Sequence, residues 1–184
     1  MKKIVITALA AVMILGLGVG SVSAASASNS LKTGTFGFNV GFGDSVFGDT
    51  GVISITGKYL LTSDLALLAG IGTQVSSGDL DADYFATSVG VRKYLNTDDF
   101  APFIEGKFSY AKEKFQIPSN QIDQTGFDFS ANFGAEYFLH KQFSIEGAVG
   151  VGFGTATIRR TGLPDQDYTY FGTHSVGISA NFYF

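Results

Sequence analysis

The feature that most constrains this chain is an alternation of apolar residues with small or polar ones. The clearest run is at the C-terminus, where every second residue is apolar: Val176, Ile178, Ala180, Phe182 and Phe184. The residues between them include Ser175, Gly177, Ser179 and Asn181. A period of two residues is typical of a β-strand with two different faces. The pattern therefore predicts an all-β protein.

The alternation recurs along the whole chain after its N-terminus. It marks eight segments, at residues 34–42, 52–60, 65–74, 84–95, 102–112, 127–138, 143–156 and 168–184. Most of them reach the roughly 9–11 residues that a tilted strand needs to cross a bilayer. The second segment is marginal in length.

The connections between the segments fall into two kinds. The short, polar ones are 60–64, 96–101 and 139–142, and the longer ones are 43–51, 75–83, 113–126 and 157–167. Short periplasmic turns and longer external loops are the arrangement of bacterial outer-membrane barrels. We therefore expect the three short turns to share the periplasmic side.

The two faces of the predicted strands indicate the surroundings of the barrel. One face is dominated by Gly, Ala, Ser and Asn, which fit the narrow interior of a small barrel. The other face carries aromatic residues near both segment ends, such as Tyr137 and Phe143 at one end and Phe127 and Tyr170 at the other. Two aromatic girdles around an apolar band are typical of a lipid-facing surface. The sequence thus predicts an eight-stranded antiparallel transmembrane β-barrel, with a soluble lipocalin-type domain as the alternative.

The N-terminus has the composition of an export signal. Lys2 and Lys3 precede an apolar stretch over residues 4–19, and Val22-Ser23-Ala24 supplies the small residues of a cleavage site. We expect a signal peptide over residues 1–24 and a barrel domain over residues 25–184. The alternatives are cleavage after Ala27 and an uncleaved helical anchor.

Composition excludes several classes of function. The chain has no Cys, which removes disulfides, thiolate metal sites and a cysteine nucleophile. Its net charge of −4 and its pI near 5.0 argue against nucleic acid as a partner.

The C-terminal residues Gly177-Ile178-Ser179-Ala180-Asn181-Phe182-Tyr183-Phe184 carry a family resemblance. With the export signal and the eight segments, this ending resembles the small eight-stranded outer-membrane barrels of the OmpA, OmpX and opacity type. The resemblance implies a monomer in the cell outer membrane, surrounded by lipid and lipopolysaccharide. It also implies that Phe182 and Phe184 form the signal read by the barrel-assembly machinery, and that the loops contact an extracellular ligand.

Seven charged residues fall on the inward parity: Lys58, Arg92, Glu105, Lys107, Asp128, Glu136 and Glu146. Buried charges must pair or become neutral. We expect a structural salt-bridge network that fills the lumen, with Lys107 between Glu136 and Glu146. A gated ion path and a catalytic carboxylate pair are the alternatives.

One position conflicts with the alternation. Tyr94 matches Tyr59 and Tyr137 in a weak repeat around the short turns, yet Tyr94 has the inward parity. A β-bulge reverses the facing of the residues that follow it. We therefore predict a bulge at Arg92-Lys93 that turns Tyr94 outward.

The chain offers little for catalysis or metal binding. Its two histidines, His140 and His174, lack a neighbouring serine on the same strand face, as a nucleophilic pair would need. Asp79, Asp81 and Asp83 resemble the start of a calcium loop without the rest of it. We predict no catalytic, cofactor or metal site. The expected role is structural or adhesin-like, with a narrow channel as the alternative and a lipid A-modifying enzyme disfavoured.

Overall fold

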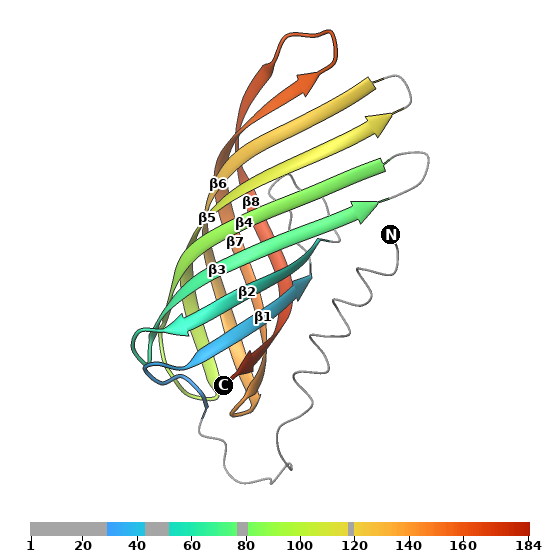
Figure 1. Ribbon diagram of the computed structural model, residues 1–184. Coiled ribbons are helices and arrows are strands. Elements are labelled where there is room, and N and C mark those ends of the chain that lie inside the picture. Colours follow the sequence, from blue (N-terminus) through green and yellow to red (C-terminus); the bar gives the residue numbers. More distant parts are fainter. Residues whose placement is uncertain (1–28, 43–51, 77–80, 118–119) are drawn as a thin grey trace.

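The computed structural model describes residues 29–42, 52–76, 81–117 and 120–184. These residues form eight strands: β1 (Phe36–Phe42), β2 (Ile53–Leu60), β3 (Leu65–Ser76), β4 (Asp81–Tyr94), β5 (Phe100–Ile117), β6 (Asn120–His140), β7 (Phe143–Arg160) and β8 (Gln166–Tyr183). Each strand pairs with the next in antiparallel fashion, and β8 pairs with β1 to close the barrel (Figure 1). The predicted fold class is confirmed. The expected signal peptide lies outside the described residues.

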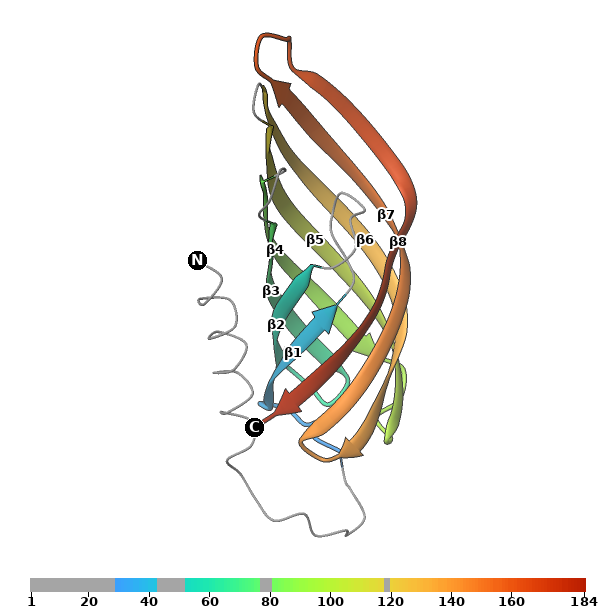
Figure 2. The same ribbon diagram turned by 90° about the vertical axis from the view of Figure 1, so that its right-hand side faces the viewer.

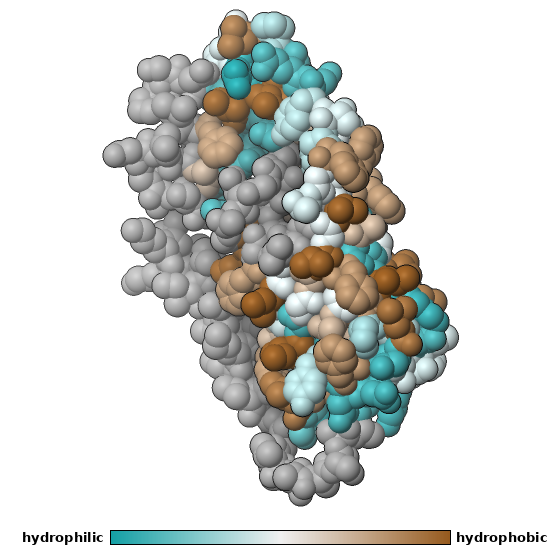
Figure 3. Space-filling model, turned by 180° about the vertical axis from the view of Figure 1, so that it is seen from behind, coloured by the Kyte–Doolittle hydropathy of each residue, from teal (hydrophilic) through white to brown (hydrophobic). Residues whose placement is uncertain are grey.

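The alternation sorts side chains between the lumen and the outer surface. Large apolar side chains are exposed on the outside of every strand, and Figure 3 shows them across the outer face. The inward positions carry small and polar residues such as Asn39, Ser130 and Asn181, all of them buried. Among the described residues, no helix is long and apolar enough to cross a membrane.

The strands differ greatly in length. β1 and β2 have 7 and 8 residues, whereas β5, β6, β7 and β8 have 18, 21, 18 and 18. The four long strands exceed the roughly 9–11 residues that cross a bilayer. They project as a curved sheet beyond the rim formed by β1 and β2 (Figures 1 and 2).

The expected long loops at 75–83, 113–126 and 157–167 are therefore largely wrong. Pairing between β5 and β6 continues to Ile117 and Asn120, and pairing between β7 and β8 continues to Ile158 and Gln166. Both faces of these extensions carry polar residues, so the apolar alternation fades although the strands go on. The connection 43–51 lies outside the described residues.

The predicted bulge at Arg92-Lys93 is also wrong. β4 pairs with β5 from Asp81 to Tyr94 without a register shift. Tyr94 points into the lumen and is 1% exposed, because its hydroxyl contacts Lys58 and Glu136 there. Tyr94 therefore has the same position relative to a short turn as the exposed Tyr59 and Tyr137, but it does not share their outward orientation.

A register shift instead lies in β8. Val149 pairs with Val176 and Gly150 with His174, so β8 carries one extra residue. The shift turns Tyr170 into the lumen, although the alternation in the sequence predicts that it faces outward. Its hydroxyl donates a hydrogen bond to Asp128 Oδ2 at 3.2 Å. Gly154, opposite Tyr170, leaves room for the ring, because a Cβ there would lie 2.4 Å from it.

Candidate functional site

A cluster of buried charges crosses the lumen near its short-turn end. Lys58 Nζ lies 2.9 Å from Glu136 Oε2 and 3.5 Å from Glu146 Oε2. Arg92 reaches Glu146 at 2.6 Å and Glu105 at 2.7 Å. The side chains of all five residues are less than 9% exposed. Lys58, Arg92, Glu105, Glu136 and Glu146 are called the lumen network below.

Neutral groups complete the hydrogen bonding of the buried carboxylates. Tyr94 and Tyr183 donate their hydroxyls to Glu136 at 2.7 and 2.5 Å. Asn39 and Asn181 donate side-chain amides to Glu146 at 3.0 and 3.1 Å. A buried ion pair offsets its desolvation cost only when the remaining lone pairs are satisfied in this way.

The expected position of Lys107 between Glu136 and Glu146 is wrong, since Lys58 and Arg92 lie there instead. No carboxylate of the described residues lies within 4.0 Å of the Lys107 ammonium. Lys107 lines the same cavity as Glu105 and Arg92. The lumen network itself contains two cations and three carboxylates, and Lys107 is a further lumen cation that does not belong to it.

Asp128 lies apart from this network. Its side chain is 1% exposed and accepts the hydrogen bond from Tyr170 nearer the projecting sheet. Six of the seven predicted lumen charges thus lie in or beside the lumen network. The seventh, Asp128, lies nearer the projecting sheet.

A cavity of about 140 Å³ lies in the lumen next to the network, between the network and the projecting sheet. Hydroxyl and amide groups line it, among them Ser54, Thr56, Ser88, Ser109 and Asn132. A cavity of this size with several polar groups in its lining has room for water. Toward the projecting sheet, Val52 and Tyr84 line the same cavity and form a second buried cluster with Ala111.

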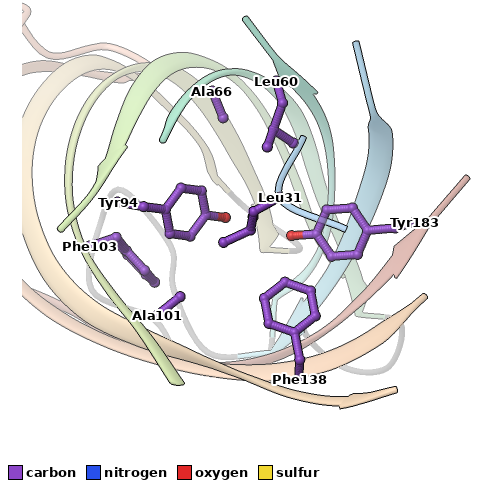
Figure 4. Packing of buried hydrophobic residues seen from close by; sticks show 8 residues of the cluster. All are labelled: Leu31, Leu60, Ala66, Tyr94, Ala101, Phe103, Phe138 and Tyr183. Carbon is purple, nitrogen blue, oxygen red and sulfur yellow. The ribbon is translucent and has the colours of Figure 1, made fainter. Parts of the chain in front are cut away.

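The floor of the barrel is built by a segment that sequence reasoning missed. Leu31, five residues before β1, is 3% exposed among side chains from six strands: Leu60, Ala66, Tyr94, Ala101, Phe103, Phe138 and Tyr183. Figure 4 shows Leu31 at the centre of this ring. The segment 29–34 is anchored by hydrogen bonds from Asn29 to Thr97 O and from Ser30 to Lys141 O. Gly34 N also donates to Leu60 O at 2.8 Å.

We expect Leu31→Ala to lower the free energy of unfolding by about 2–3 kcal/mol, because it leaves a cavity in a closed apolar cluster. Urea titration of the refolded protein in lipid vesicles measures this loss. Leu163→Ala, at an exposed leucine of the β7–β8 connection, is the matched control and should be nearly neutral. Equal stability of the two variants would contradict a packed floor.

The described residues contain no group of three His, Asp or Glu that could hold a metal ion. His140 is the last residue of β6, and its Nδ1 accepts a hydrogen bond from Gln142 N in the β6–β7 turn at 3.3 Å. The side chains of His174, Asp79 and Asp81 lie outside the described ones.

Comparison with known proteins assigns the chain to a family. The model of the outer membrane protein beta-barrel domain matches residues 8–184. The chain belongs to this outer-membrane β-barrel family. No curated protein sequence matches this outer-membrane barrel.

Solved structures show the same fold at low sequence identity. The N-terminal β-barrel domain of Pseudomonas aeruginosa OprF matches with a TM-score of 0.58 and 14% identity, covering 83% of this chain and 98% of that one. A major outer membrane protein from Thermus thermophilus matches with a TM-score of 0.51 and 14% identity, covering 82% and 98%. Neisserial surface protein A matches with a TM-score of 0.51 and 11% identity, covering 82% and 95%. At these identities the comparison supports the fold alone.

Proposed function

We propose that this outer-membrane barrel is a closed, non-catalytic anchor that holds a rigid sheet outside the membrane for surface contact. The observation that carries the proposal is the double closure of its lumen. Leu31 and its ring form an apolar floor, and the buried lumen network lies directly above it. Val52, Tyr84 and Ala111 add a buried layer toward the projecting sheet.

The projecting sheet supports the contact role. β5 and β6 pair up to Ile117 and Asn120, so their hairpin is hydrogen-bonded to its tip. Its outward side chains near the tip include the exposed Lys112 and Lys114. The β7–β8 tip carries an exposed ion pair between Arg159 and Asp165 at 3.0 Å. A partner would meet an ordered, charged surface with little conformational entropy to lose.

Planar-bilayer recording of the refolded protein tests the closure. We expect no stable open-channel currents, since eight strands leave a lumen that side chains fill. The second candidate function, a narrow channel for small or apolar solutes, is favoured by the polar cavity in the lumen. Steady unitary currents from the wild-type protein would overturn the closed anchor in favour of the channel.

The proposal includes export by the N-terminal signal and a periplasmic location for the short turns. Because the chain has no Cys, single cysteines introduced at Ser63 and Thr161 can be labelled separately. An impermeant maleimide added to intact cells should modify Thr161→Cys and spare Ser63→Cys. Lysed cells provide the control, because both sites should then react. The reverse pattern in intact cells would invert the proposed orientation.

A further inference from the structure

Exposed phenylalanines form a row across the outer surface of the four long strands: Phe108 on β5, Phe127 on β6, Phe153 on β7 and Phe171 on β8. Phe108 stacks on Phe127, and Phe153 pairs with Phe171. Aromatic girdles lie where hydrocarbon meets the headgroup region. Beyond the girdle, the outward residues become Lys, Thr, Arg and Asp, so this level is a boundary between lipid tails and headgroups.

A groove of about 480 Å³ lies directly beyond the girdle. Its lining includes four threonines, Arg159 and Asp167. Thr125 pairs with Thr157, and Thr155 pairs with both Phe127 and Thr169, so the hydroxyls form one patch continuous with the girdle.

The charged groups of the groove have defined positions. The Arg159 guanidinium is 63% exposed and is held through its Nε by Asp165. Thr157 donates to Asp167 Oδ1 at 2.6 Å on the β8 side. Lys112 pairs with Thr125 on the β5 side, so a second cation flanks the patch. A planar guanidinium recognises phosphate oxygens through paired hydrogen bonds, and hydroxyls both donate to and accept from sugars.

We propose that this groove binds the phosphorylated sugar headgroup of a glycolipid in the outer leaflet. The occupant is an amphiphile, because the patch continues into the lipid-facing girdle at Phe127. Its sugar lies on the threonines, its phosphate meets Arg159 and Lys112, and its acyl chains run along the apolar band. The assignment rests on the proposed function, which places the long hairpins outside.

Binding of purified diphosphorylated lipid A to the protein in phosphatidylcholine nanodiscs tests the proposal. The test variant is Thr125→Val/Thr157→Val/Arg159→Gln, in which valine preserves strand propensity and shape. It should bind lipid A at least about tenfold more weakly than wild type. Thr73→Val removes an exposed hydroxyl from β3, away from the groove, and should bind as wild type does.

Two results would overturn the proposal that this groove binds a glycolipid headgroup. One is equal affinity of the triple variant and wild type, with folding of both shown by heat-modifiable gel mobility. The other is competition by phosphatidylglycerol as effective as that by lipid A, since charge alone would then explain binding. A failed orientation is detected separately by the cysteine labelling in cells, which this in vitro titration does not depend on.

Discussion

Lys58→Met should lower the free energy of unfolding by about 3–5 kcal/mol, the cost of breaking a buried pair by removing one partner. Lys58 is 1% exposed and its ammonium reaches both Glu136 and Glu146. Methionine preserves most of the side-chain volume and removes the charge. Among the described residues, Glu136 would then retain Arg92, at 3.6 Å, as its one cation.

Urea titration of the refolded barrel, followed by far-ultraviolet circular dichroism, measures this loss. Lys107→Met is the matched control, because no described carboxylate lies in contact with Lys107, and it should cost less than about 1 kcal/mol. Lys58→Met/Glu136→Gln should recover part of the loss, since it removes the buried charge that was left alone. Equal losses for Lys58→Met and Lys107→Met would show that the network does not stabilise the fold.

Deletion of Phe184 should leave most chains unassembled in cells. Phe184 N donates to Phe36 O at 2.9 Å, and its ring stacks on Phe38 at 5.8 Å between centroids. Phe182 also stacks on Phe38, with 5.1 Å between the ring centroids. The deletion thus removes a contact at the β1–β8 closure together with the terminal aromatic that we propose as part of the assembly signal.

Pulse-chase labelling with heat-modifiable gel mobility measures the folded fraction. Phe171→Ala is the control, because Phe171 is 76% exposed on β8 and lies 13 residues before Phe184. That variant loses lipid contact and retains the C-terminus, so it should assemble. A normal folded yield without Phe184 would exclude this residue from the assembly signal.

The fold was predictable because its signal is repeated along each strand. Period-two alternation identifies strands one at a time, and the exposed apolar face distinguishes a lipid-facing barrel from a soluble one. The alternation did not predict the projecting parts of β5 to β8, because a strand outside lipid needs no apolar face. The bulge in β8 gave one local hint, since Phe171 and Ile178 are both exposed but have opposite parity.

The candidate site was predictable in its residues but not in its pairs. Parity placed Lys58, Glu136 and Glu146 on the lumen side. The contacts themselves join β2 to β6 and β7, strands that are not neighbours, and they depend on the stagger of the closed barrel. Leu31 left no signal at all, because a single apolar residue in a polar segment has no periodicity.

The buried position of Leu31 has a consequence for how the molecule comes together. Its side chain is enclosed by residues as distant in the sequence as Leu60 and Tyr183. Its binding place therefore does not exist until the first and last strands have met, and contacts of such long sequence separation form late. The N-terminal segment is thus the last part to settle, and its burial is a marker of completed maturation. A chain stalled during insertion would leave the peptide bond after Lys32 open to trypsin. In the finished barrel Lys32 is exposed, but the hydrogen bonds from Thr35 N to Lys32 O and from Gly34 N to Leu60 O hold this bond in a turn, so trypsin should cleave it more slowly.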